Sequence, residues 1–225
     1  MKNRNSANIL VALVLSVCFI ACTKVDKTYL QPRENLAKFN GTVYDYIKAQ
    51  PAGVYDSLLF VLNRVPDLID SLKTQPVTFF SLTNKSFELA IYDLNFNAGI
   101  PQGTINLSNI NASVLDTFLC RYIIRDKYLT TDLLRATDGY TLPSIKYSYL
   151  MNLQYSYTNA SGYVNGGPRA IIFSDTRTSP FISLWVRTNA ITVDVVADNG
   201  IVNVISPGHA FGFGSEFQTK VYDNF

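Results

Sequence analysis

The chain has 225 residues, of which 48% are hydrophobic and 16% are charged, so it is long and apolar enough to bury a core. Its 19 Lys and Arg residues nearly balance 17 Asp and Glu residues, and no basic cluster occurs, which argues against nucleic-acid binding. The single histidine excludes a metal site built from several histidines, and we expect no metal or other cofactor.

The N-terminus has the pattern of a secretory signal. Lys2 and Arg4 precede an apolar run from Ile9 to Ala21, which is shorter than the roughly 20 residues that a membrane-spanning helix needs. The run ends in Phe-Ile-Ala-Cys at residues 19–22, which resembles a bacterial lipobox. We therefore expect lipid attachment at Cys22; an ordinary secretory signal with a chance cysteine is the alternative.

The lipobox implies how the rest of the N-terminal region is organised. We expect a lipoprotein signal peptide at residues 1–21 and a polar tether at residues 22–40. Thr23 stands where Asp is the usual inner-membrane retention signal, so the resemblance implies a lipid anchor in the bacterial outer membrane. Whether the periplasmic or the surface-exposed face carries the protein is left open. One folded domain is expected at residues 41–213, followed by a C-terminal tail at residues 214–225.

The first half of the domain has helical periodicity, interrupted by one strand. Apolar residues recur at helical spacing in several segments, namely 43–47, 55–65, 66–72 and 84–94. An apolar strand is expected at residues 77–82, with Thr83 or Asn84 capping the helix after it. Residues 95–110 are expected to be a loop, and Ser113 is expected to cap a further helix that buries Phe118.

The second half has the alternation of strands. Apolar and aromatic residues occupy the odd positions from Ile145 to Tyr157, which predicts a half-buried strand. Further strands are expected over residues 170–173, 181–186 and 191–196. Asn199-Gly200 predicts a type I′ hairpin turn that places Val195 opposite Val204. Helices followed by strands indicate an α+β fold.

Four segments resemble the fasciclin-like adhesion domain, in its order and spacing: 78–87, 115–124, 137–142 and 199–205. The family's usual Tyr-His pair is Tyr122-Ile123 here, and Asn203 replaces a usual histidine. The resemblance implies N-terminal helices packed on an antiparallel sheet in a wedge-shaped sandwich. It also implies a surface or extracellular binding protein, without catalysis as the norm.

Tyrosines are the candidate ligand-binding residues, because their flat apolar faces and hydroxyls suit contact with sugars or proteins. Five of them fall close together in the sequence: Tyr147, Tyr149, Tyr155, Tyr157 and Tyr163. The alternative is that most of them lie on the core face of the strand. We expect no catalytic residue, and we interpret His209 as a surface or packing residue.

Three functions remain open at this stage. The first is a lipid-anchored envelope protein that binds a protein or polysaccharide ligand at the cell surface without catalysis. The second is an accessory glycan-binding lipoprotein of a polysaccharide-uptake system. The third is a hydrolase that uses carboxylates, which the absence of a nucleophile motif does not exclude.

Overall fold

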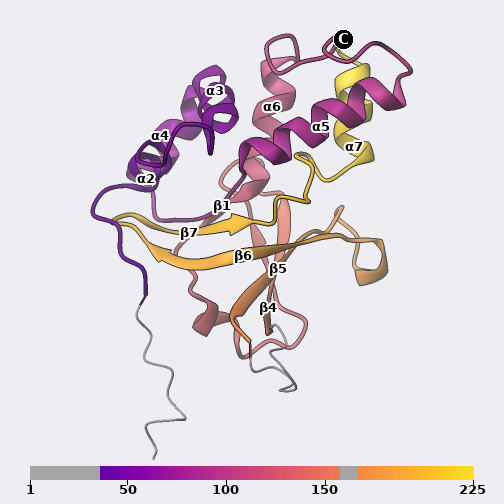
Figure 1. Cartoon of the computed structure of the whole chain (residues 1–225). Helices are drawn as coiled ribbons and strands as arrows, with labels where there is room; N and C mark the ends of the chain where they lie inside the picture. Colours follow the sequence, from indigo (N-terminus) through magenta and orange to yellow (C-terminus); the bar gives the residue numbers. More distant parts are fainter. Residues whose placement is uncertain (1–35, 158–166) are drawn as a thin grey trace, which may run out of the picture. The chain divides into compact units, whose positions relative to one another are not determined.

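The computed structural model describes residues 36–157 and 167–225 (Figure 1). The expected signal peptide, Cys22, nearly all of the tether and Tyr163 lie outside these residues. The part from Leu36 to Phe225 forms one compact unit. Within the described part, no helix has both the length and the apolar character that crossing a membrane requires.

The order of elements confirms the α+β prediction. The helices are α2 (Val43–Lys48), α3 (Asp56–Arg64), α4 (Pro66–Thr74), α5 (Asn84–Asn97), α6 (Ala112–Leu119) and α7 (Ser215–Tyr222). The strands are β1 (Val77–Ser81), β2 (Ile123–Arg125), β3 (Tyr140–Pro143), β4 (Leu150–Tyr157), β5 (Arg169–Asp175), β6 (Val186–Val196) and β7 (Gly200–Ile205). Short 3-10 turns include η2 (Cys120–Tyr122), η3 (Thr130–Leu133) and η4 (Ile182–Leu184).

The strands form one sheet that nearly closes on itself. Their order is β2-β1-β7-β6-β5-β4-β3, and all neighbours are antiparallel except β1 and β7. A bridge between Ile124 and Ser144 joins the two ends of this order, which leaves little free edge. The Phe80 and Phe173 rings stack in the interior with centroids 3.9 Å apart, which packs β1 against β5.

The β6–β7 turn is formed by Asp198 and Asn199, one residue earlier than predicted, and Gly200 is the first residue of β7. The turn is closed by a 2.9 Å hydrogen bond from the Ala197 N–H to the Gly200 carbonyl, and neither Asn199 nor Gly200 has a positive φ. Val195 therefore pairs with Val202 rather than with Val204. Glycine is needed at position 200 for a different reason, since a Cβ there would lie 2.5 Å from the Val77 carbonyl oxygen.

The predicted strand over residues 145–157 is wrong in its first part. Residues 145–149 form a turn, in which Tyr147 and Ser148 have positive φ, and β4 begins only at Leu150. A 2.8 Å hydrogen bond from the Ser144 N–H to the Tyr149 carbonyl closes this turn. Apolar and polar residues therefore alternate through residues 145–149 although the backbone forms a turn there.

Two other expected local features also differ. Residues 181–185 are not a strand but a loop that contains η4, and β6 starts at Val186. Helix α6 is capped by Asn111, whose Oδ1 accepts from the Ser113 N–H at 2.9 Å, rather than by Ser113. Asp116, three residues after Ser113, binds Lys146 and Tyr147.

The folded unit extends beyond the expected boundaries of 41 and 213. Before residue 41, the Phe39 N–H donates to the Val196 carbonyl at 2.9 Å. After residue 213, α7 buries Phe217 and Val221, with the Phe217 ring 5.1 Å from that of Phe118. The segment expected as a tail is therefore a helix that helps to cover the core.

Candidate functional site

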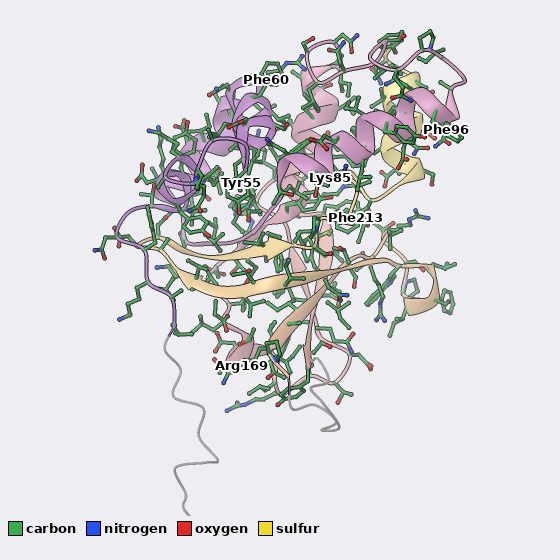
Figure 2. The ribbon with its side chains drawn as sticks, viewed as in Figure 1. Tyr55, Phe60, Lys85, Phe96, Arg169 and Phe213 are labelled. Atoms are coloured by element: carbon green, nitrogen blue, oxygen red, sulfur yellow. The ribbon has the colours of Figure 1, made fainter. Side chains whose placement is uncertain are left out.

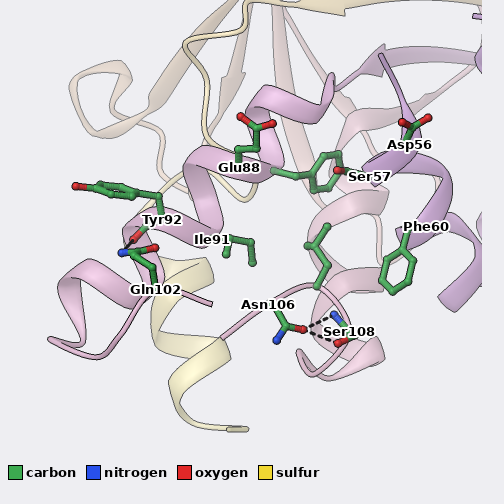
Figure 3. Close-up of a pocket in the computed structure, with 11 residues that line it drawn as sticks. Asp56, Ser57, Phe60, Glu88, Ile91, Tyr92, Gln102, Asn106 and Ser108 are labelled. Atoms are coloured by element: carbon green, nitrogen blue, oxygen red, sulfur yellow. Dashed lines mark hydrogen bonds between the residues drawn. The ribbon is translucent and has the colours of Figure 1, made fainter. Parts of the chain in front are cut away.

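A groove of about 670 Å³ lies between α3, α5 and the loop that follows α5 (Figure 3). We call it the α3–α5 groove. It is lined by Asp56, Ser57, Phe60, Phe87, Glu88, Ile91, Tyr92, Gln102, Asn106, Leu107 and Ser108. Its volume falls in the range of small-ligand and peptide sites.

Helices α3 and α5 form two walls of the groove, and one asparagine joins them. The Asn84 side chain at the start of α5 accepts a hydrogen bond from the Ser57 N–H of α3 at 2.8 Å. Its amide group donates to the Gly53 carbonyl at 3.0 Å. Asn84, which was expected as a possible helix cap, thus joins the beginnings of both helices.

The third wall is the loop over residues 98–110, and Asn95 holds it. The buried Asn95 side chain exchanges two 2.8 Å hydrogen bonds with Ile105, donating to its carbonyl and accepting from its N–H. Gln102 donates to the Tyr92 carbonyl at 3.3 Å, and Asn106 accepts from the Ser108 N–H at 3.0 Å. The groove is therefore built of ordered backbone on all three sides.

Large apolar side chains are exposed in and beside the groove. The exposed fractions are 44% for Phe60, 51% for Tyr92 and 65% for Phe96. The Tyr92 and Phe96 rings, one helical turn apart, stack with centroids 5.8 Å apart. Figure 2 shows Phe60 and Phe96 at the periphery of the helices. Exposed aromatic rings at both ends of a groove are typical of a binding region.

One side of the groove is acidic. Figure 3 shows Asp56 and Glu88 on one side, opposite Asn106 and Ser108. Asp56 accepts from the Gly53 N–H at 2.8 Å, and Glu88 pairs with Lys85 at 3.2 Å. No lysine or arginine is among the lining residues of the described chain. An apolar surface with a carboxylate rim suits a partner that presents apolar and basic side chains.

The groove residues were missed from the sequence, although a weak signal existed. Phe60 lies off the apolar face that α3 was expected to bury, and Tyr92 and Phe96 lie off that of α5. The signal that could have identified them is an aromatic residue on the solvent side of an amphipathic helix.

The structure does not gather the candidate tyrosines into one surface. Tyr147 and Tyr149 lie before β4, whereas Tyr155 and Tyr157 are at its end, and six extended residues span roughly 20 Å. The Tyr155 and Tyr157 rings meet edge to face at 4.6 Å, with Tyr157 exposed. Tyr163 lies outside the described residues. The four described tyrosines therefore form two separate pairs rather than one binding surface.

The hydroxyls of the first pair are hydrogen-bonded within the protein, although the Tyr147 ring is exposed. The Tyr147 hydroxyl donates to Asp116 at 2.5 Å, and the Tyr149 hydroxyl donates to Asp175 at 2.7 Å. The Tyr149 ring also lies 3.8 Å from the Arg121 guanidinium. Burial, and then the hydrogen bond to Asp175, raise the pKa of Tyr149 above its ordinary value. Tyr149 therefore belongs to an internal network.

That network is centred on the buried Arg121. Its guanidinium donates to Asp175 at 2.8 Å and to both carboxylate oxygens of Glu216 at 2.8 Å. Burial opposes the charged form of Arg121, but the bond to Glu216 and the charge of Asp175 outweigh it, so its pKa is raised. The same bond lowers the pKa of Glu216. The network ties η2, β5 and α7 together.

The single histidine is also internal. His209 Nε2 lies 2.7 Å from the Tyr122 hydroxyl, which accepts a 3.1 Å hydrogen bond from the Gly212 N–H. Burial lowers the pKa of His209 to about 4, so it is neutral at neutral pH. The packing interpretation of His209 is therefore confirmed, although the residue is buried rather than on the surface.

Neither a metal cluster nor a reactive thiol is found among the residues that the structure describes. No group of three or more His, Cys, Asp or Glu side chains there is arranged to hold a metal ion. Cys120 is buried, and burial raises the pKa of its thiol to about 12, which suits a small core residue rather than a nucleophile.

Comparison with solved structures identifies the fold. The chain is similar to a FAS1 domain pair from the insect cell adhesion molecule fasciclin I, with a TM-score of 0.50 and 16% identity over 80% of this chain. The match covers about half, 52%, of the solved chain that holds the domain pair. No family model and no curated protein matches the sequence. The chain therefore has the fasciclin-like (FAS1) fold, and at this identity the likeness shows the fold alone.

Proposed function

We propose that this chain is a lipid-anchored protein of the bacterial outer membrane whose FAS1 domain binds a partner through the α3–α5 groove. The binding is non-catalytic and serves adhesion or ligand capture at the cell envelope. The FAS1 fold is shared with a protein described as a cell adhesion molecule, which supports an adhesion-type role.

The observation that carries this proposal is the exposed Phe60 and Tyr92 in an ordered groove. Covering these two rings removes apolar surface from water, which is the main driving force of association. The acidic side at Asp56 and Glu88 favours a protein segment with basic residues over an acidic polysaccharide.

An adhesion assay tests the role of the groove. Cells that display the native chain are compared with cells that display Phe60→Ala combined with Tyr92→Ala, and Tyr140→Ala is the matched control on β3. Since truncated hot-spot aromatics commonly weaken binding by a factor of about ten or more, we expect attachment to fall in the groove variant only. Equal attachment in all three would contradict the proposal.

The lipid anchor is tested separately. Labelled palmitate fed to the native host should enter the chain, and the Cys22→Ser variant should take up none. Label in the variant would place the acyl chain elsewhere. The result bears on the anchor and leaves the groove assay unaffected.

A glycan-binding accessory lipoprotein is the second proposal, and the Tyr155–Tyr157 pair favours it. The exposed Tyr157 ring beside Tyr155 offers a face on which a sugar ring stacks. Under this proposal Tyr157→Ala abolishes binding to a glycan array, while Phe60→Ala leaves it unchanged. The hydrolase interpretation is the third, and it requires turnover of a glycoside or ester by the purified chain.

A further inference from the structure

The segment between β5 and β6, residues 176–185, exposes large apolar side chains at one place. We call it the β5–β6 loop. Phe181 is 66% exposed, Leu184 is 56% exposed, and Ile182 between them is also exposed. Figure 1 shows this loop, in orange, projecting from the ends of β5 and β6. Exposed apolar side chains gathered on a projecting loop are typical of an interaction site.

The loop holds its shape through its own hydrogen bonds. The Leu184 N–H donates to the Phe181 carbonyl at 3.0 Å, and the Trp185 N–H donates to the Ile182 carbonyl at 3.2 Å. The Trp185 indole N–H donates to the Ser179 carbonyl at 2.8 Å. These three donors are satisfied within the loop, which lowers the cost of moving them out of water.

The charged residues in the sequence of the loop have one sign, and the carboxylate near them in space, Glu216, which lines a pocket with Arg177, is paired with Arg121. Arg177 and Arg187 are its flanking charged residues, and no Asp or Glu occurs between positions 176 and 193. The preceding carboxylate, Asp175, is buried against Arg121. An apolar tip between two arginines is complementary to anionic headgroups that overlie acyl chains.

We propose that the β5–β6 loop binds the surface of an anionic lipid bilayer. Phe181, Ile182 and Leu184 enter the boundary between headgroups and acyl chains, and Trp185 lies at the level of the headgroups. Arg177 and Arg187 contact lipid phosphates. Complementary charge and an internally bonded backbone favour lipid over a protein groove or a second copy of this chain.

Trp185 is the only tryptophan of the chain, so its fluorescence reports on this loop alone. The full chain carrying Cys22→Ser is mixed with phosphatidylcholine vesicles that contain phosphatidylglycerol and brominated acyl chains. We expect a blue shift of the Trp185 emission and quenching by the bromines. Unshifted and unquenched emission from vesicle-bound protein would overturn the proposal, as would a shift caused by self-association without vesicles.

Variants locate the contact. Phe181→Ser combined with Leu184→Ser should reduce partitioning by about tenfold or more, whereas Phe96→Ser, an equally exposed aromatic on α5, should not change it. Arg177→Gln leaves the tip intact and should weaken binding to anionic vesicles about fivefold, with no effect on pure phosphatidylcholine. Equal loss in the Phe96→Ser control would count against the loop as the contact.

Discussion

Tyr122 and His209 are 87 positions apart in the sequence, yet the Tyr122 hydroxyl and the His209 Nε2 lie 2.7 Å apart in the core. In the fasciclin-like pattern that the sequence resembles, a histidine directly follows this tyrosine, whereas position 123 here is an isoleucine. The structure thus gives Tyr122 a histidine partner from a distant segment, beyond the last strand.

The buried His209 predicts a loss of stability in mild acid. Burial lowers its pKa from 6.5 to about 4, so the unfolded chain binds a proton more readily than the folded one. The neutral His209 contributes its full share of the stability above about pH 6.5. As the pH falls towards 4, the free energy of unfolding is expected to drop by about 3 kcal/mol. Urea unfolding at pH 7 and 4.5 measures this. A His209→Gln chain with the same pH dependence as the native chain would refute the assignment.

Arg121 predicts the largest effect of a single charge deletion. Arg121→Ala leaves the buried Asp175 without its cation, which is expected to lower the free energy of unfolding by about 3–5 kcal/mol. Lys85→Ala removes the exposed pair with Glu88 and serves as the control, with an effect of about 0.5 kcal/mol or less. Denaturant midpoints of both variants measure the difference. Similar losses of stability in the two variants would show that Arg121 is not the centre of the buried network.

The close approach of β1 and β7 predicts that Gly200 tolerates no side chain. In Gly200→Ala the new methyl group meets the Val77 carbonyl oxygen and the Val43 side chain, which is expected to destabilise the fold by about 1–3 kcal/mol. Gly208→Ala is a matched control, because the nearest atom to its added Cβ is the Ser206 Oγ at 4.0 Å. Thermal unfolding of the two variants should separate clearly; equal midpoints would contradict the packing described.

The hydrogen bonds of Asn95 predict that the loop wall of the groove can unfold locally when they are removed. Asn95→Ala removes both buried hydrogen bonds to Ile105 and should increase amide hydrogen exchange across residues 98–110, while β7 stays protected. Asn97→Ala, which loses only an exposed bond to Gln218, is the control. Unchanged exchange in the loop of the Asn95→Ala chain would show that other contacts hold it.

The helices before residue 120 and the strand–helix unit at residues 77–97 follow from the sequence, because the spacing of apolar residues there reflects burial against one core, whereas α7 was expected as a tail. The turn at residues 145–149 does not, since Tyr147 continues the alternation while its backbone has a positive φ. The exposed residues of η4 misled the strand prediction for a related reason, because an apolar run has the same pattern whether a core or a partner covers it.

The groove was beyond sequence reasoning because it is a product of tertiary packing. Asn84 and Asn95 look like ordinary cap and loop residues, and only their bonds to Ser57 and Ile105 show that they assemble three walls. The candidate tyrosines, in contrast, were conspicuous in the sequence, but Tyr149 belongs to an internal network, the exposed Tyr147 bonds to Asp116, and Tyr155 and Tyr157 lie at the end of β4.

We propose above that the α3–α5 groove is the surface through which this chain binds its partner. The most direct test of this proposal is photo-crosslinking on living cells, with a benzophenone amino acid placed at position 60 in one chain and at position 140 in another. If partners bind in the groove, position 60 gives a discrete adduct that disappears with Tyr92→Ala, and position 140 gives none. Adducts from position 140 alone, or equal adducts from both, would contradict the proposal.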